Sequence, residues 1–352
     1  MFIKIRHMRL KMKKTFILFA ISLFVISTAS AKIKFSAAPE ISLLNGETEY
    51  ELDINFSYID TSVSPNVGVT YRLTSLLEFP LDVVVGGFTF QLAPEEDLSK
   101  WTIHGGVFTS FTDPGGKMFD TDWEGASPYY DYTKWSYTES DAEMSMTLLD
   151  LDFTFRLAQN EKVTLSALLG GRYQKIKQDV IGLGGWQIAY DDTLYYSNPN
   201  NLITINEENY KNMRVGYYEV TYKHFKFGLL TEYRFSPKLT GKLKTVFSPL
   251  RFDDYDDHIL RFKESTADGD GNSFIGDFQL RYNINRADIK DKLFVELGAS
   301  FVKLKATGPQ TQSWYGDDGA TPEDDTGEMI SGIPHTVRST QTKINFRLGL
   351  YF

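Results

Sequence analysis

The chain has 352 residues, a formal net charge of −9, no cysteine, and 20 tyrosine and 26 phenylalanine residues. The absence of cysteine excludes disulfides and thiolate metal sites, and the acidic balance argues against nucleic acid as a partner, because phosphate backbones are bound through clusters of Lys and Arg. No stretch after the first 31 residues approaches 18 consecutive apolar residues, so the pattern does not indicate membrane-spanning helices.

Residues 1–31 have the features of a secretory signal peptide. Six basic residues precede the apolar run TFILFAISLFVIS, and Ala29 and Ala31 form an A-x-A cleavage site. The run is shorter than the roughly 20 residues that a membrane-spanning helix needs, so a retained anchor is the weaker interpretation. We expect cleavage after Ala31, leaving one domain of residues 32–352. The loss of six positive charges lowers its net charge from −9 to −15.

A pair of carboxylates lies in the segment TDPGGKMFDTDW, where Asp120 and Asp122 are two positions apart. Two neighbouring carboxylates repel each other, so that one tends to hold or share a proton, which suits acid–base work on a water molecule. A D-x-D pair in a loop is more often simply solvated. Taken alone, the pair leaves both interpretations open.

Apolar and polar residues alternate strictly in several later segments, as in strands that have one apolar face. Charged residues such as Asp150, Asp152 and Arg156 lie opposite an unbroken apolar face, and the chain ends in Phe352. A soluble β-sandwich also alternates, but this combination in an exported chain favours an outer-membrane barrel. The apolar faces are Leu149, Leu151, Phe153, Phe155 and Leu157; Phe278, Leu280, Tyr282 and Ile284; Leu293, Val295, Leu297, Ala299 and Phe301; and Ile344, Phe346, Leu348, Leu350 and Phe352.

The connections between these segments indicate the number of strands. The short polar segments APEED, AQNEK, FSPK and NRADIKDK resemble periplasmic turns, and longer polar segments lie near 58–66, 114–140, 181–212, 259–272 and 306–336. Four turns and five loops connect ten strands. The prediction is an all-β, ten-stranded antiparallel transmembrane β-barrel with long extracellular loops and short periplasmic turns. Side chains about fill an interior of that size, which disfavours a general pore.

The strand predicted for residues 239–258 carries a second group of titratable residues. With Leu243 and Phe247 facing lipid, the even positions face the interior, and Asp254, Asp256 and His258 follow in that phase. A histidine two residues from an aspartate on the same face can be oriented by that carboxylate, which also stabilises its imidazolium. His258 is therefore a candidate general base.

The segment GGKMFDTDW, residues 115–123, together with DYDDH, residues 254–258, in a ten-stranded barrel, resembles the omptins, outer-membrane endopeptidases of Gram-negative bacteria. The likeness runs in register from about Ile41 to Phe352. It implies a protease without a covalent intermediate, facing outward from the outer membrane. In that scheme a water attacks the peptide carbonyl, with His258 as base, Asp256 orienting it, and Asp120 and Asp122 as the second pair.

The resemblance also implies a substrate preference. Omptins cut next to basic residues through an acidic pocket, in which Asp254 matches one carboxylate. The second carboxylate, on the first strand, falls near GETEYEL, where the simple register puts Tyr50 and only a one-residue shift brings in Glu49 or Glu51. The expected substrates are peptides or proteins with basic residues, which an acidic chain also attracts by long-range steering.

A lipid partner is suggested by the strand that begins near Val163. Its outward-facing positions continue with Tyr173, Lys175 and Lys177. Lys223 of the next strand faces outward as well. Such cations suit lipopolysaccharide phosphates, and Lys177 stands where the family places an arginine for lipid A. Ordinary anchoring of interfacial lysines is an equal alternative.

We expect no cofactor, apart from lipopolysaccharide as a possible requirement for activity, and no metal site. The alternative function, from another class, is a non-enzymatic outer-membrane barrel that acts as an adhesin or surface-interaction protein.

Overall fold

The computed structural model describes residues 33–62, 65–94, 100–112, 116–191, 196–284, 293–317 and 324–352, without the side chains of residues 189–201. The predicted signal peptide, residues 1–31, lies outside the described residues. Within the described ranges, no helix is long and apolar enough to cross a membrane.

The described chain consists almost entirely of strands, with two short 3-10 helices. The strands are β1 (Ile33–Asp60), β2 (Val67–Pro80), β3 (Val83–Pro94), β4 (Trp101–Ser110), β5 (Gly116–Ser127), β6 (Tyr130–Gln159), β7 (Val163–Asp191), β8 (Tyr196–Ile205), β9 (Arg214–Arg234), β10 (Leu239–His258), β11 (Lys263–Ile284), β12 (Leu293–Trp314) and β13 (Met329–Tyr351). The helices are η1 (Glu207–Asn209) and η2 (Ile259–Arg261).

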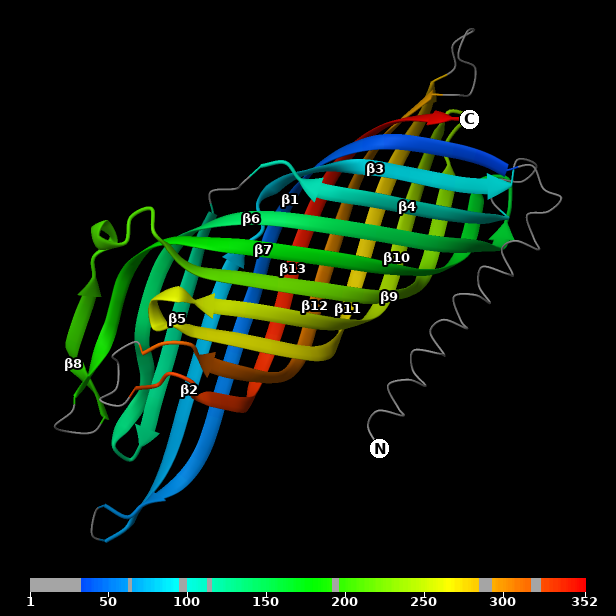
Figure 1. The fold of residues 1–352 in the computed structure, drawn as a ribbon. Coiled ribbons are helices and arrows are strands. Elements are labelled where there is room, and N and C mark those ends of the chain that lie inside the picture. The colour runs from blue at the N-terminus through cyan, green and yellow to red at the C-terminus, as the bar shows by residue number, and fades with distance from the viewer. Residues whose placement is uncertain are drawn as a thin grey trace.

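Antiparallel pairing closes these strands into a barrel (Figure 1). β2 and β3 pair with successive parts of β1 and form one interrupted barrel strand, and β5 and β4 form a second between it and β6. β7, β9, β10, β11, β12 and β13 follow in order, and β13 pairs with β1. The ring therefore has ten barrel strands, which confirms the predicted fold class. β8 pairs with β7 outside this ring.

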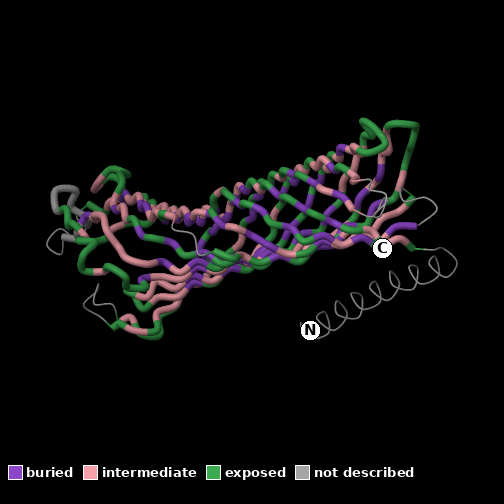
Figure 2. Tube along the Cα trace, turned by 90° about the horizontal axis from the view of Figure 1, so that it is seen from above, coloured by how far each residue is buried: buried purple, intermediate pink, exposed green. Residues whose placement is uncertain are grey.

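Exposed apolar side chains form a band around one half of the barrel. Buried and exposed residues alternate along much of β6, β10, β12 and β13, as the colours of Figure 2 show, and the exposed faces of β6 and β13 are those predicted from their alternation. This band adjoins the end at which Ser36 of β1 pairs with Tyr351 of β13. We call the opposite end, which carries β2, β5 and β8, the distal end.

Several segments expected to be long loops are mostly strand. β5 and β6 occupy nearly all of 116–140, β11 begins at Lys263, and β12 continues to Trp314. The reason is that the strands keep their backbone hydrogen bonds beyond the apolar band, where the outward residues are polar and many of the buried inward residues are polar too. Apolar–polar alternation is lost there while pairing continues, so the pattern underestimated the strand lengths.

Charged side chains fill the interior within the apolar band. Arg281, Glu296, Arg347 and Glu40 are directly opposite one another on β11, β12, β13 and β1, and their charges alternate along this row. Arg281 Nε lies 2.8 Å from Glu296 Oε2, and Arg347 bridges Glu296 to Glu40. Each buried charge thus has an opposite charge beside it, as burial requires.

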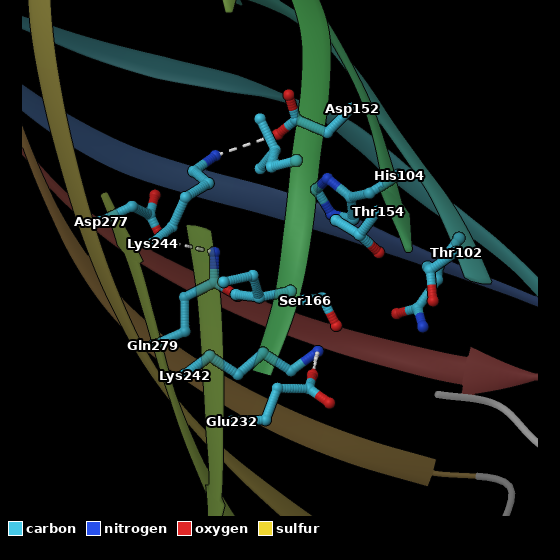
Figure 3. A pocket seen from close by; sticks show the side chains of 13 residues that line it. Thr102, His104, Asp152, Thr154, Ser166, Glu232, Lys242, Lys244, Asp277 and Gln279 are labelled. Atoms are coloured by element: carbon cyan, nitrogen blue, oxygen red, sulfur yellow. Dashed lines mark hydrogen bonds and ion pairs between the residues drawn. The ribbon is translucent and has the colours of Figure 1, made fainter. Parts of the chain in front are cut away.

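A second charged group surrounds a small interior cavity of about 60 Å³ (Figure 3). Lys244 Nζ lies 3.1 Å from Asp152 Oδ2, and Lys242 Nζ lies 2.7 Å from Glu232 Oε1. The charged groups on that side of the cavity therefore already have ion-pair partners. The cavity is therefore better described as part of the polar filling of the barrel than as a reactive site.

The first strand changes partner at Gly46, where β3 gives way to β2. Leu81 N, in the break between β2 and β3, donates to Gly46 O at 2.8 Å. Gly46 has φ +150°, and a Cβ there would lie 2.0 Å from Thr340 O. Only glycine fits this close approach, and β1 continues past it toward the distal end.

Candidate active site

Asp256 and His258 end β10 on its inward face. Burial alternates along the strand up to Asp256, with the even positions inside, as the strand phase predicts. His258 Nε2 lies 2.7 Å from Asp256 Oδ2, and the two side chains are 23% and 6% exposed. The carboxylate is thus buried beneath an imidazole that remains accessible. This contact places the ring against the carboxylate, which can orient it.

Asp120 and Asp122 lie within β5 and not in a loop. Ser136 Oγ of the neighbouring β6 donates to Asp122 Oδ2 at 2.7 Å. Asp120 Oδ1 is buried and has no hydrogen-bond partner among the described residues. Burial raises the pKa of Asp120 well above its usual range, and the adjacent charge of Asp122 raises it further. Asp120 therefore holds a proton more readily than an exposed aspartate.

Three of the four predicted catalytic residues meet at one pocket in the distal end, with a volume of about 300 Å³, and Asp122 is not part of its lining. Asp120, Asp256 and His258 all line it. Going around the ring, β6, β7 and β9 separate β5 from β10 on one side, so the two pairs approach the pocket from different walls. The pocket combines concave shape with titratable groups, as active sites do.

Two basic residues lie next to this group. Arg261 of η2 lines the pocket, and Lys263 is the cross-strand partner of His258. Burial lowers the pKa of Lys263, while the charges of Asp256, Asp122 and Asp120 oppose that shift. The carboxylates of the site are thus partly offset by nearby cations, which stabilises negative charge at this end of the barrel.

This arrangement can carry out acid–base chemistry on water. An imidazole held by a carboxylate can accept a proton near neutral pH, and a buried carboxylate pair can share one. Within the described ranges, no group of three or more His, Asp or Glu side chains is arranged to hold a metal ion.

The structure gives Asp254 different surroundings from those expected of a substrate-binding carboxylate. His335 Nε2 lies 2.7 Å from Asp254 Oδ2, and these side chains are 0% and 2% exposed. Tyr218 OH donates to the same oxygen at 3.3 Å. Burial raises the pKa of Asp254, and the bond from His335 opposes that shift. The Asp254 carboxylate is therefore inaccessible to solvent and already accepts hydrogen bonds from His335 and Tyr218.

Glu49 and Glu51 do not line the interior, because β1 keeps the simple register and not the one-residue shift that would have brought either of them to the pocket position. Tyr50 occupies the inward position and is fully buried, and Gln310 Nε2 donates to its hydroxyl group. Glu49 and Glu51 face outward and pair with Arg338, with Nη1–Oε2 distances of 3.3 and 2.7 Å. The strand keeps a regular two-residue period here, so neighbouring glutamates cannot share the face of Tyr50.

His335 and Tyr218 were missed by the sequence interpretation. A signal was present for His335, because odd positions of the last strand face the interior around Lys343, and the same phase extended back by eight residues places His335 inside. No comparable signal connected it to Asp254. That contact joins β10 to β13, which are separated by β11 and β12 in the ring.

The residues expected to bind lipopolysaccharide gather on the outer face of β7 and β9. Tyr173 is directly opposite Lys223, and Lys175 and Lys177 continue the same face toward the distal end. Lys175 Nζ lies 2.6 Å and Lys177 Nζ 3.8 Å from oxygens of Glu219, and Lys223 pairs with Asp253. The cations form one patch just beyond the apolar band, but carboxylates already contact them.

Comparison with known proteins connects the chain to a sequence family and to a solved structure of similar fold. A sequence model of the Omptin family matches residues 83–348. The crystal structure of the outer membrane protease OmpT from Escherichia coli superposes with a TM-score of 0.65 at 13% identity, covering 92% of this chain and 100% of that one. At this identity the superposition shows the shared fold alone.

More distant barrels add nothing further. A Pseudomonas aeruginosa FadL homologue matches with a TM-score of 0.24 and 9% identity, covering 91% of this chain and 90% of that one. No curated protein sequence matches the chain significantly.

Proposed function

The chain belongs to the Omptin family of outer-membrane proteases, and on that premise we propose that its distal pocket is the active site of an endopeptidase. The observation that carries the proposal is that Asp120, Asp256 and His258 line one pocket, with the imidazole of His258 held by Asp256. These positions lie on two strands far apart in the sequence. Only the barrel brings them together.

The proposed reaction uses water as the nucleophile. His258 accepts a proton from water as its oxygen forms a bond to the peptide carbonyl carbon, and Asp256 stabilises the resulting imidazolium. Asp120, with its raised pKa, donates a hydrogen bond that holds the water or the developing oxyanion, and Asp122 completes the pair. When the C–N bond breaks, the imidazolium returns the proton to the leaving amine.

Cleavage next to basic residues, as the family resemblance implies, would need an available carboxylate beside the pocket. Asp254 is bonded to His335, and Glu49 and Glu51 face outward with Arg338. Asp257 lines the pocket, and the hydrogen bond that its Oδ1 accepts from Tyr315 leaves its other oxygen for a substrate cation. The basic preference therefore stays a prediction, supported by Asp257 and by long-range steering from the acidic chain.

The distal end is proposed to face outward from the outer membrane. The start of β1, the C-terminal Phe352 and the short connections after β6 and β9 lie at the other end, and short turns mark the periplasmic side in such barrels. The apolar band adjoins that end as well. The pocket would then open toward polypeptides outside the cell.

The lysine patch is proposed to bind lipopolysaccharide and to support activity. Replacing Lys175, Lys177 and Lys223 together by alanine should raise the lipopolysaccharide concentration for half-maximal activity about tenfold. The effect is smaller than roughly 1 kcal/mol for each lysine near an anionic surface would give, because Glu219 and Asp253 already contact them. Titration of the refolded barrel with lipopolysaccharide measures this concentration.

A matched control is Lys211→Ala, since Lys211 is also an exposed lysine paired with a carboxylate, Glu208, at 3.3 Å. It should leave the half-maximal concentration unchanged. Equal titrations for the wild type and the triple variant would instead support ordinary interfacial anchoring by these lysines.

The proposed function is tested by incubating the barrel, refolded with lipopolysaccharide, with unstructured polypeptides and following new fragments by mass spectrometry. We expect cleavage by the wild type and none by the Asp120→Ala and His258→Ala variants. If the wild type leaves every polypeptide intact, the protease proposal fails. The surface-binding alternative would then be favoured by Phe56, Tyr58 and Ile59, which are exposed on the β1–β2 hairpin.

A further inference from the structure

Lys263, the first residue of β11, lies beside His258 on the same wall of the barrel. It is directly opposite His258 of β10 on one side and Trp314 of β12 on the other. Directly opposite residues of antiparallel strands point to the same face of the sheet, with Cβ atoms about 5 Å apart. His258 lines the distal pocket, so the side chain of Lys263 also begins on the inward face. The proposed reaction does not use it.

The surroundings of Lys263 support this inward direction. Ser265 and Ala267, which share its face of β11, are buried, whereas Thr266 is exposed. The ammonium nitrogen of Lys263 lies 6.0 Å from the centroid of the Trp314 ring, within reach of a cation–π interaction. The ring therefore restricts a side chain that would otherwise be flexible.

Lys263 differs from other lysines inside the barrel in its ion pairing. Lys242, Lys244 and Lys343 lie 2.7 to 3.1 Å from a carboxylate oxygen. Among the residues that the structure describes, none forms an ion pair with Lys263. No described carboxylate in direct contact neutralises its charge, which can therefore act on other groups in the site.

The charges that act on Lys263 come from both catalytic pairs. Burial lowers the pKa of Lys263 most, and the charge of Arg261 lowers it further. The charges of Asp256, Asp122 and Asp120 oppose this shift. Because charge interactions weaken with distance, the ammonium group lies near both walls that carry the pairs. Its field acts on the space between them, where water and the peptide carbonyl are proposed to react.

We propose that Lys263 stabilises the oxyanion formed during peptide hydrolysis and that Trp314 positions its ammonium group. As the water oxygen bonds to the carbonyl carbon, His258 takes the proton and the π electrons of the carbonyl move onto its oxygen. Lys263 faces this negative charge and keeps its own protons. When the C–N bond breaks, the electrons return to the carbonyl bond.

The inference rests on the proposed protease function and adds a catalytic residue to it. A cation that is already in place stabilises developing charge without reorganisation, and it is more effective where water is partly excluded. Arg261 also lines the pocket, but it is exposed, so water screens its charge more strongly. Lys263 is therefore the better placed of the two cations.

Lys263→Met keeps the length of the side chain but removes its charge. It should lower kcat by roughly 10²- to 10³-fold, the usual loss for an oxyanion donor, with little change in KM, because the contact exists only in the transition state. Lys263→Arg keeps the charge and should restore most of the activity. Steady-state kinetics with a peptide that the wild type cleaves measure both, using barrels refolded with lipopolysaccharide.

The matched control is Lys117→Met, which also removes a cation from the distal end. The Lys117 side chain is 47% exposed, and its Nζ lies 2.9 Å from Asp141 Oδ1. This variant makes the same change in net charge without touching the pocket. It should leave kcat and KM unchanged.

The alkaline limb of the pH profile gives a readout that a merely structural role of Lys263 would not move. The charged groups around Asp120 are, besides His258 in the same pocket, Asp122, Asp256, Arg261 and Lys263, and its direct neighbours on β2 and β6 do not titrate. Burial and the negative charges raise the pKa of Asp120, and the two cations lower it. Without Lys263 the pKa of Asp120 rises further, so Asp120 keeps the proton it donates to higher pH. The alkaline limb of kcat/KM should therefore move to higher pH in Lys263→Met and stay in place in Lys263→Arg.

Trp314→Leu tests the positioning role of the ring. It should lower kcat by roughly 2- to 30-fold, the worth of a cation–π contact. The Lys263→Met/Trp314→Leu double variant should be no slower than Lys263→Met, because the ring acts through the ammonium group. Multiplicative losses would show that Trp314 does not act through Lys263.

The outcomes separate this inference from the proposed function. A barrel-specific shift on unheated denaturing gels shows that each variant is folded, and Lys263→Gln replaces Lys263→Met where the latter does not fold. Unchanged kcat in the folded uncharged variant, or equal losses in it and in Lys263→Arg with an unmoved alkaline limb, would refute the role of Lys263 while the protease function stands. If the wild type cuts no polypeptide, both proposals fall.

Discussion

Replacing His258 by glutamine should lower kcat/KM for peptide hydrolysis by roughly 10²- to 10⁴-fold, the usual contribution of a positioned general base. Glutamine keeps the approximate size of the side chain but cannot accept the proton of water. Asp256→Asn should have a comparable effect, because its Oδ2 lies 2.7 Å from His258 Nε2 and would no longer stabilise the imidazolium. Steady-state kinetics at equal concentrations of folded barrel measure both values.

The two residues should behave as one unit. The Asp256→Asn/His258→Gln double variant should be little worse than the poorer single variant, as is found for catalytic groups that act together. Tyr255→Phe, on the same strand immediately before Asp256, is the control, because its hydroxyl donates to Glu264 and takes no part in the proposed chemistry. Fully multiplicative losses in the double variant would show that Asp256 and His258 act independently, contrary to the proposal.

Glu296→Ala should destabilise the barrel by about 3–5 kcal/mol, the cost of breaking a buried ion pair from one side. Glu296 is fully buried between Arg281 and Arg347, which are its direct cross-strand neighbours on β11 and β13. Its removal leaves two guanidinium groups with less compensating charge inside the barrel. Equilibrium unfolding in urea, followed by tryptophan fluorescence in detergent or lipid, measures the loss.

The exposed ion pair of Asp270 provides the comparison for Glu296. Asp270 Oδ1 lies 3.2 Å from Arg251 Nε, and both side chains are well exposed, so Asp270→Ala should cost no more than about 1 kcal/mol. Similar losses for the two variants would mean that the interior row of charges is solvated and contributes little to the stability of the barrel.

The fold could be predicted because a barrel wall in contact with lipid imposes a period of two. The outward residues of β6, from Leu149 to Leu157, and of β13, from Ile344 to Leu350, are those that alternation indicated. Beyond the apolar band the outward residues of the same strands are polar, and many inward residues are polar as well, although they remain buried. The period disappears there, which is why β5 and the distal part of β6 were expected to be loops.

The sequence predicted the part of the candidate site that depends on strand phase alone. Asp254, Asp256 and His258 share a face because β10 stays regular to its end. The surroundings of each carboxylate could not be predicted, because they depend on contacts between strands that lie across the barrel from each other. Asp254 meets His335 from β13, and Phe79 of β2 stacks on Tyr218 of β9. Those contacts convert an expected substrate-binding aspartate into a buried structural one.

The central claim, that the distal pocket hydrolyses peptide bonds with water, is tested most directly by a peptide library digested in ¹⁸O-labelled water. Mass spectrometry identifies the new termini made by the wild type and by an Asp120→Asn/His258→Gln variant shown to be folded. The account predicts ¹⁸O in the new carboxyl group of each wild-type fragment and at least a 10²-fold lower yield from the variant. An intact library with the wild type, or equal yields from both proteins, would contradict it.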